Sequence, residues 1–298
     1  MTLSALVVGD VMTDVIVRPH GPMVIGSDRA ATIRSHPGGS GANQAEWLAA
    51  LGVPTRFAAR VGAGDQETLA TSFRARGVEA VLAADPALPT GVLVTLLDES
   101  GERSFLTDRG ANVSLSATDL PTDLLDDVGV VLVSGYSLFA DGPRAAVLAL
   151  LASARERGIE TAIDAASTGF LAEVGPDRFL EWATGTSLLL ANAAEAALLA
   201  GSDEPQSQCA RLGERCETII LKQGAAGASV GTRQGISASA EGLPADVVDS
   251  TGAGDAFAAG FLAARLAALP LEEQLARGIA AGARAVARLG GRPDSTPN

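Results

Sequence analysis

The sequence predicts an α/β fold in three layers, α/β/α, with a mostly parallel central β-sheet and a small β-sheet lid. Apolar runs rich in Val, Leu and Ile alternate with alanine-rich helical stretches along most of the 298 residues, as in a parallel sheet covered on both faces. Two segments, 11–36 and 90–109, break this alternation and are typical of strands and turns. Several helical stretches end at a glycine, where a left-handed residue commonly follows a helix: Gly52, Gly77, Gly158 and Gly201.

The elements of the core follow one another along the chain. The run ALVVG at 5–9 predicts the first strand, because it is short, apolar and rich in β-branched residues. The stretch after Asp255 is apolar nearly all round and predicts a long buried helix. Between them we expect helix 43–52, strand 55–62, helix 66–77, strand 128–135, helix 143–158, strand 160–164, strand 187–192, helix 193–201 and strand 217–222.

The lid is predicted from the two segments without helical pattern. Residues 90–109 read as a hairpin whose loop DESGE (98–102) carries the glycine that tight turns favour. We therefore assign residues 11–36 and 90–109 to the lid, with surface decoration of the core as the alternative. The core comprises residues 1–10, 37–89 and 110–298. Exposed strand edges and apolar faces on such a lid predict a homodimer that pairs through it.

Composition excludes several classes of function. The net charge is -13 and no run of Lys or Arg occurs, so nucleic acid and anionic membranes are poor partners. No apolar run approaches the roughly 20 residues that span a bilayer, and the first residues read as a strand and not as a signal peptide. We expect a cytoplasmic protein with a small-molecule substrate. With only two histidines and two cysteines, carboxylate acid/base chemistry is favoured over a Ser-His-Asp or Cys-His mechanism.

The tetrapeptide GAGD occurs at 62–65 and again at 252–255. The second copy opens the buried helix, so the unpaired N–H groups of its first turn should face a partly dry cavity that an anion can approach. A buried carboxylate at Asp255 then requires a function, with helix capping as the alternative. The helix after Asp65 is amphipathic, and capping explains that aspartate sufficiently.

Two longer motifs resemble signatures of one family. Residues 249–262 (DSTGAGDAFAAGFL) resemble the C-terminal signature of the PfkB/ribokinase family of carbohydrate kinases, and residues 37–52 (PGGSGANQAEWLAALG) resemble its N-terminal Gly-Gly signature. The resemblance covers essentially the whole chain. It implies a ribokinase-like fold and an ATP-dependent sugar kinase that transfers the γ-phosphate to a hydroxyl of a sugar or sugar acid with the help of Mg²⁺.

The resemblance also implies roles at the second signature. Asp255 would be the catalytic base that takes the proton from the acceptor hydroxyl as that oxygen attacks the phosphate. The main-chain N–H groups of Gly252, Ala253 and Gly254 would form an anion hole. Asp249 and Thr251 become candidate contributors to a monovalent-cation site, with K⁺ as the candidate ion.

On the acceptor side, glycines let the backbone turn beside a ligand, and an asparagine offers a donor and an acceptor to sugar hydroxyls. A glycine-rich loop with an Asn cap is the alternative for this segment. Arg109 on the lid is a candidate reader of a carboxylate or phosphate, unless it is simply solvated. The substrate-binding candidates are Asp14, Gly38, Gly39, Ser40, Asn43 and Arg109.

On the nucleotide side, Asn192 and Glu195 resemble the family's N-x-x-E element, through which Glu195 would hold Mg²⁺ by way of water. A capping box explains the same two residues equally well. Lys222 and the turn after it resemble the segment that lies along ATP. The candidate ATP-binding residues are Asn192, Glu195, Lys222, Gly224, Gly227 and Gly254.

Departures from the family's pattern point away from ribose as the acceptor. Gly135 and Tyr136 stand where ribokinases often carry a glutamate, and Ser40 stands where they often carry a lysine. A nucleoside kinase is the nearest rival, disfavoured by an aromatic content of 4%. A catalytically silent sugar- or nucleotide-binding regulator is a second rival, against which an intact Asp255 speaks. A dinucleotide-dependent dehydrogenase is disfavoured because no G-x-G-x-x-G follows the first strand.

Overall fold

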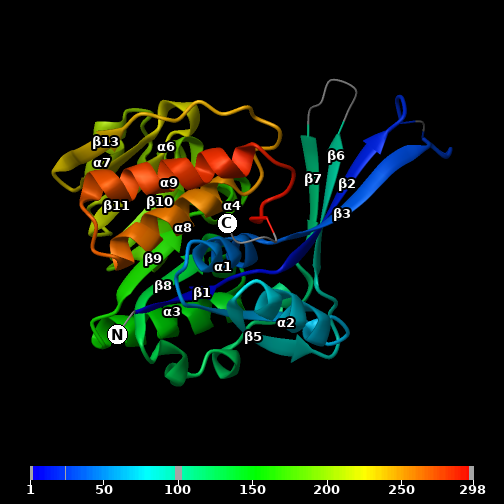
Figure 1. Ribbon diagram of the computed structural model, residues 1–298, viewed down its shortest axis with the longest axis horizontal. Helices are drawn as coiled ribbons and strands as arrows, with labels where there is room; N and C mark the ends of the chain where they lie inside the picture. Colours follow the sequence, from blue (N-terminus) through cyan, green and yellow to red (C-terminus); the bar gives the residue numbers. More distant parts are fainter. Residues whose placement is uncertain (1–2, 24, 98–102, 295–298) are drawn as a thin grey trace.

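A computed structural model describes residues 3–23, 25–97 and 103–294 of the chain. A large α/β body carries a smaller sheet that projects from one side (Figure 1). The predicted three-layer α/β fold with a lid is confirmed. The central sheet has the strand order β13-β12-β11-β10-β9-β8-β1-β4-β5, and the small sheet has the order β3-β2-β6-β7.

The central sheet is parallel from β5 to β11 and antiparallel at its β12–β13 edge. Strands β5, β12 and β13 were not predicted. β5 is alanine-rich and only half-buried, and the other two are short and contain Gly and Ser, so none has the apolar run of a central strand. The strands are β1 Ser4–Val8, β4 Thr55–Gly62, β5 Val78–Asp85, β8 Val128–Ser134, β9 Glu160–Asp164, β10 Leu188–Asn192, β11 Thr218–Lys222, β12 Ala228–Thr232 and β13 Gly235–Ala240.

Helices cover both faces of the sheet, and successive strand residues alternate between two cores. Leu6 and Val8 of β1 face a core built with α3, whereas Ala5 and Val7 face a core built with α1 and α8. The α-helices are α1 Ser40–Ala50, α2 Gln66–Ala75, α3 Asp141–Glu156, α4 Thr168–Val174, α5 Pro176–Ala183, α6 Ala193–Ala200, α7 Pro205–Leu212, α8 Ala253–Leu266 and α9 Leu271–Val286. The 3₁₀ helices are η1 Gly110–Ser114, η2 Ala117–Asp119, η3 Thr122–Leu125, η4 Gly135–Leu138 and η5 Gly224–Ala226.

The four glycines predicted to end helices in the left-handed conformation do so. Gly52, Gly77, Gly158 and Gly201 have φ angles of 84°, 78°, 71° and 67°, in the left-handed region. Helices α4, α5, α7 and α9 were not predicted. In the part of the chain that the structure describes, no helix is long and apolar enough to cross a membrane.

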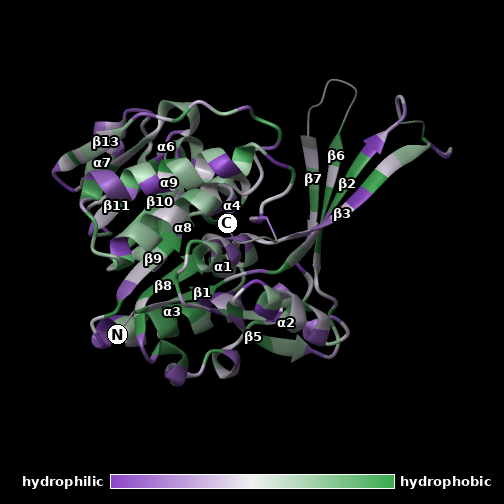
Figure 2. Ribbon diagram, viewed as in Figure 1, coloured by the Kyte–Doolittle hydropathy of each residue, from purple (hydrophilic) through white to green (hydrophobic). Residues whose placement is uncertain are grey.

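The lid sheet consists of β2 Met12–Pro19, β3 Ala31–Gly38, β6 Gly91–Leu97 and β7 Arg103–Asp108. β6 and β7 form the predicted antiparallel hairpin, whose loop 98–102 lies outside the described residues. Side chains alternate between the two faces of a sheet. Met12, Asp14 and Leu93 line the cavity beneath the lid, so by alternation Val15, Val17 and Val94 lie on the opposite face. The lid strands carry several hydrophobic residues (Figure 2).

The segment after α9 returns to the start of α1 (Figure 1). The indole Nε1 of Trp47 donates a hydrogen bond of 2.9 Å to the carbonyl of Gly291. The guanidinium of Arg292 donates to Glu46 Oε1 at 2.7 Å and to the carbonyl of Gly38 at 2.9 Å. The side chain of Glu46 is fully buried and that of Arg292 is 5% exposed. This segment therefore closes a buried ion pair directly behind the turn at Gly38.

Candidate active site

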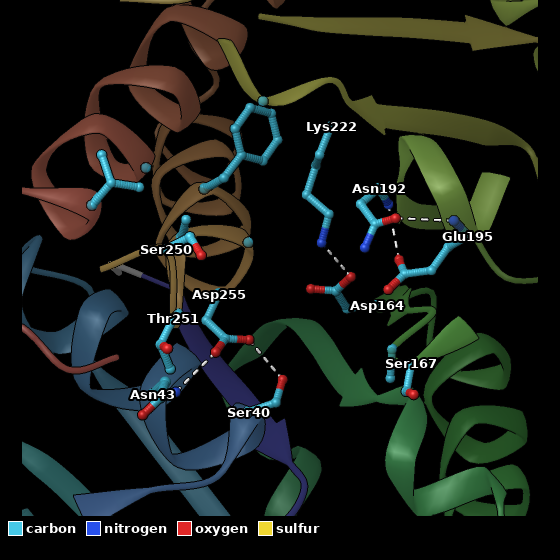
Figure 3. Close-up of a pocket in the computed structure, with 18 of the residues that line it drawn as sticks. Ser40, Asn43, Asp164, Ser167, Asn192, Glu195, Lys222, Ser250, Thr251 and Asp255 are labelled. Carbon is cyan, nitrogen blue, oxygen red and sulfur yellow. Dashed lines mark hydrogen bonds and ion pairs between the residues drawn. The ribbon is translucent and has the colours of Figure 1, made fainter. Parts of the chain in front are cut away.

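A cavity of about 1190 Å³ lies between the lid and the carboxyl ends of the parallel strands. Open α/β sheets place their ligands at this edge. Asp164, Asn192 and Lys222 end β9, β10 and β11 and line the cavity. The first turns of α1 and α8 complete it, so that the two signature motifs meet there (Figure 3).

Asp255 lies in the first turn of α8, inside this cavity. The N-cap of α8 is Gly252, with φ 75°, so Asp255 does not cap the helix and the capping alternative is excluded. Its carboxylate accepts hydrogen bonds from Ser40 Oγ at 2.6 Å and from Asn43 Nδ2 at 2.9 Å (Figure 3). Gln44 Nε2 adds a third contact at 3.2 Å. Side chains of the first signature thus hold the aspartate of the second.

The environment of Asp255 brings its ionisation close to neutral pH. Burial raises the pKa of Asp255 to about 7, and the charge of Asp164 adds to the rise. The hydrogen bonds from Ser40 and Asn43, and the charge of Lys222, act in the opposite direction. A carboxyl group with such a pKa exchanges protons readily under physiological conditions.

The second aspartate of the GAGD pair has a different setting. Asp65 is exposed and occupies the N-cap position of α2, but its side chain makes no capping hydrogen bond. The capping position predicted for Asp65 is therefore confirmed, but no side-chain hydrogen bond accompanies it, and the charge beside the N-terminus suits the helix dipole. The two copies differ because α8 is buried whereas α2 is mostly exposed.

An ion pair crosses the cavity floor. Lys222 Nζ lies 2.5 Å from Asp164 Oδ1, and Gln44 Nε2 donates to the other oxygen of Asp164 at 3.1 Å. Burial disfavours the charge of Lys222, but Asp164 and Glu195 outweigh it and raise the pKa of Lys222. Sequence reasoning missed Asp164 and Gln44. The signal available was an acidic residue at the end of a predicted strand and a polar residue directly after Asn43.

Asn192 and Glu195 form a capping box at the start of α6. The Asn192 side chain accepts from the Glu195 N–H, and the Glu195 carboxylate accepts from the Asn192 N–H, both at 2.9 Å. Glu195 is buried, and burial together with Asp164 raises its pKa to about 7, against the lowering effect of Lys222. The capping role is confirmed, and both residues also line the cavity.

Replacing Asn192 with alanine is expected to destabilise the protein by about 1 kcal/mol, because the N–H of Glu195 loses its acceptor. The free energy of unfolding in urea measures this loss. Asn192→Asp keeps an acceptor at the same place and is the matched control. An alanine variant as stable as the asparagine protein would contradict the capping role.

The glycine turn before α1 makes close contacts that a larger residue would not allow. Gly39 has φ 95°, and a Cβ there would lie 2.5 Å from the carbonyl of Asp10. A Cβ on Gly38 would lie 2.3 Å from the carboxyl of Asp14. Burial, and secondarily the charge of Asp10, raise the pKa of Asp14 to about 6. Asp14 Oδ1 is buried and accepts no hydrogen bond, which leaves it available to a ligand hydroxyl.

The other substrate-binding candidates are placed differently from one another. Ser40 and Asn43 line the cavity, but their donors are engaged by Asp255. Asn43 Oδ1 is buried and accepts no hydrogen bond. Arg109 is half-buried at the base of the lid and also lines the cavity.

The nucleotide-side candidates line the opposite end of the cavity. A Cβ on Gly227 would lie 2.0 Å from the carbonyl of Ala240, so the turn after Lys222 requires glycine there. Sequence reasoning missed an apolar wall at this end, formed by Leu243, Val247, Phe257, Ile279 and Val286. Its partly exposed leucine and valine side chains lie in a loop without a periodic pattern, which gave no signal.

Asp249 lies behind the first turn of α8. It is 3% exposed, and its carboxylate accepts from Thr251 N at 3.1 Å, from Thr251 Oγ1 at 2.8 Å and from Gly290 N at 3.1 Å. Among the described residues, no cluster of three or more His, Cys, Asp or Glu side chains forms a ready metal site.

Three aromatic side chains line one wall of the cavity. Phe105, Tyr136 and Phe170 line the cavity, and the rings of Tyr136 and Phe170 meet edge to face with centroids 5.9 Å apart. The aromatic content of the whole chain is therefore a poor guide to this cavity, because Phe105, Tyr136, Phe170 and Phe257 line it although the content is only 4%.

Comparison with known proteins agrees with this geometry. The model of the pfkB family of carbohydrate kinases matches residues 2–298. The chain is 32% identical over 276 residues to an ATP-dependent ribose-1-phosphate kinase of Halopiger xanaduensis, covering 91% of this chain and 88% of that protein. A probable sugar kinase of Rhizobium etli has a similar structure, with 25% identity, a TM-score of 0.87 and coverage of 98% and 95%. Ribokinase of Arabidopsis thaliana, solved with ribose and ATP, gives 25% identity, a TM-score of 0.82 and coverage of 99% and 97%. The chain belongs to the pfkB family of carbohydrate kinases, which are phosphotransferases that act on sugar hydroxyls.

Proposed function

We propose that this protein transfers the γ-phosphate of ATP to a hydroxyl of a sugar or sugar acid, with Asp255 as the base. The observation that carries the proposal is the placement of Asp255 inside the cavity, with a pKa near neutrality, on the first turn of a buried helix. The Halopiger relative is by its name ATP-dependent, and the Arabidopsis structure holds ribose and ATP.

The residues divide the work of the transfer. Asp14 Oδ1 accepts a hydrogen bond from a hydroxyl of the sugar, and Asp255 takes the proton of the attacking hydroxyl. A bond forms between that oxygen and the γ-phosphorus, the bond from the phosphorus to ADP breaks, and the proton stays on Asp255. The N–H groups of Gly252, Ala253 and Gly254 face the charge that develops on the phosphate, and one such preorganised donor is worth about 3 kcal/mol.

The nucleotide occupies the other end of the cavity. The adenine base of ATP packs against the apolar wall around Phe257. The glycine turn with Gly224 and Gly227 lies along the phosphates of ATP, and Lys222 supplies a positive charge. When bound, Mg²⁺ neutralises phosphate charge. The buried carboxylate of Glu195 fits such an ion, because Mg²⁺ keeps several waters and takes few protein ligands.

A monovalent cation such as K⁺ belongs to the proposal at Asp249 and Thr251. Asp249 is buried just before the first turn of α8, and its carboxylate and the hydroxyl of Thr251 would supply oxygen ligands to such an ion. Activity measured in K⁺ and in tetramethylammonium salts at equal ionic strength tests this point.

The experiment that tests the function is an ATP-consumption screen over sugars, sugar acids, sugar phosphates and nucleosides. Turnover of at least one sugar-like acceptor is expected. If none of the hydroxyl compounds in the screen leads to consumption of ATP, the catalytically silent regulator becomes the better description. In that case calorimetry with ATP and with the same sugars would identify what the regulator binds.

A nucleoside kinase is the second candidate, and the aromatic residues at the acceptor end favour it. Phe105, Tyr136 and Phe170 offer rings on which a nucleobase can stack. Turnover of nucleosides with a higher kcat/KM than any free sugar in the same screen would select this candidate.

The pH dependence of the reaction follows from the pKa of Asp255. Only the ionised carboxylate accepts a proton, so kcat/KM for the acceptor should fall about tenfold per unit as the pH drops below about 7. Ser40→Ala removes a hydrogen-bond donor to the ionised carboxylate of Asp255. The variant should therefore shift the acid limb of the plot of kcat/KM against pH to higher pH. A limb that keeps its position in Ser40→Ala would show that another group titrates.

We propose that the lid, residues 11–36 and 90–109, mediates a homodimer. Val15, Val17 and Val94 share the face opposite the cavity with Ile33, which is 54% exposed, and Leu106, which is 61% exposed. A second lid would cover this apolar face. Sedimentation at micromolar concentration should give twice the mass of 30.0 kDa, and Leu106→Glu should give the single mass. A wild-type monomer would refute the dimer.

A further inference from the structure

Arg109 stands on a rigid support at the junction of lid and core. Its carbonyl accepts from Asn112 N at 3.1 Å and from Asn112 Nδ2 at 2.8 Å. The same Asn112 side chain is bonded to both backbone groups of Val11 at 2.9 Å. Gly110, the next residue, has φ 48° and packs against the carbonyl of Pro89. The position from which the Arg109 side chain enters the cavity is therefore set by buried contacts.

The guanidinium of Arg109 is half-buried in the cavity and, within the described part of the chain, makes no hydrogen bond or ion pair. Lys222, the other cation that lines the cavity, is paired with Asp164. Asp10 acts on Arg109 through space, but its own carboxylate accepts from Gly41 N at 3.4 Å and Ser134 Oγ at 3.3 Å. Several other arginines that are not fully exposed do have acidic partners: Arg56, Arg60, Arg144 and Arg265.

A partly desolvated cation without a partner costs stability, and the cost is recovered when an anion binds. A guanidinium presents two parallel N–H groups that match a carboxylate or a phosphate. The carboxylates of Asp10, Asp14 and Asp255 also line the cavity, and they repel an anion. They therefore favour one orientation of an anionic acceptor, with its charged end at Arg109 and a hydroxyl end toward Asp255.

We propose that Arg109 binds an anionic group on the acceptor, so that the substrate is an acidic or already phosphorylated sugar and not a neutral one. This inference rests on the proposed kinase function. Arg109 determines specificity, and the carboxylates opposite it fix the orientation of the sugar.

The test compares acidic sugars with their neutral parents at saturating ATP: gluconate with glucose, and ribose 1-phosphate with ribose. The wild-type protein should have the higher kcat/KM for the anionic member of at least one pair, and the pair that responds identifies carboxylate or phosphate. Arg109→Gln should lower the ratio of anionic to neutral kcat/KM by about 10- to 100-fold, as expected for the loss of hydrogen bonds to a charged group. Arg109→Lys keeps the positive charge but lacks the two parallel N–H groups of the guanidinium. This variant should retain part of the wild-type ratio of anionic to neutral kcat/KM.

Arg18→Gln is the matched control, because Arg18 is an exposed arginine of the same lid outside the cavity; its ratio should equal that of the wild type. Calorimetric binding of the preferred anionic sugar without ATP gives a second readout, and it should be lost in Arg109→Gln while the melting temperature is retained. Wild-type preference for the neutral members, or an unchanged ratio in Arg109→Gln, would overturn the inference and leave the kinase function standing. Absence of turnover with every acceptor would instead reject the kinase function.

Discussion

Replacing Asp255 with asparagine is expected to lower kcat by about 10²- to 10⁴-fold, the contribution of a positioned general base. Asparagine keeps the size of the side chain and can still accept from Ser40 and Asn43 through its oxygen. It cannot take the proton of the attacking hydroxyl. KM for ATP should change little, because the N–H groups of the first turn of α8 remain in place.

The control for this substitution is in the sequence itself. Asp65→Asn alters the other GAGD copy, whose aspartate is exposed and does not line the cavity, and should leave kcat at the wild-type value. Initial rates with the best acceptor measure both variants. Equal turnover by Asp255→Asn and the wild type would remove Asp255 from the mechanism.

Linkage predicts that the inactive variant is not a misfolded one. Burial raises the pKa of Asp255 from 3.8 to about 7 in the folded protein. The stability that this shift provides is fully present below pH 3.8 and is lost as the pH rises through about 7. Asparagine has no charge to bury, so Asp255→Asn should be at least as stable as the wild type at pH 8, as measured by urea unfolding.

Removing Glu46 has the second largest expected effect, and it acts on the free energy of unfolding. Glu46 is fully buried between Arg292, at 2.7 Å, and Arg76, at 3.2 Å. Burial raises the pKa of Glu46, and the two arginines act against the rise. Glu46→Leu would leave Arg292 as a buried cation without its partner, at a cost of about 3–5 kcal/mol. The urea midpoint of the variant measures this cost.

A double variant distinguishes the free energy lost through the unpaired charge of Arg292 from the free energy lost through altered packing. Glu46→Leu with Arg292→Met replaces both charges with apolar groups and should regain most of the stability, because a buried ion pair is itself worth little. The double variant should still show a raised KM for the sugar, since Arg292 no longer donates to the carbonyl of Gly38. If the double variant is as unstable as Glu46→Leu, the loss arises from packing and not from the unpaired charge.

The sequence predicts well those features that are encoded locally. Strand 55–62 and strand 160–164 have the observed bounds, because each is an apolar or β-branched run between clear turn signals. The lid hairpin and the left-handed helix ends follow from glycine for the same reason. The edge strand β5 was missed, because half-burial by one helix does not produce a continuous apolar run.

Contacts between distant segments could not be predicted in this way. That Asn43 holds a sugar hydroxyl stays a prediction, whereas its hydrogen bond from Nδ2 to Asp255 could not be foreseen. Gln44 and Asp164 became visible only when α1 and β9 were brought together at the cavity. Arg292, whose sequence neighbours are Gly and Pro, gives no sign that it closes an ion pair behind the acceptor turn. Such roles depend on tertiary packing and have no period or motif in the chain.

The contacts of Gly291 with Trp47 and of Arg292 with Gly38 join segments that lie 244 and 254 residues apart in the sequence. Contacts that close such long loops cost chain entropy before they add stability, so they form after the local elements of the sheet. A cut in the chain between α9 and Gly291 would therefore separate Arg292 from Glu46 while every strand of the central sheet remains in place.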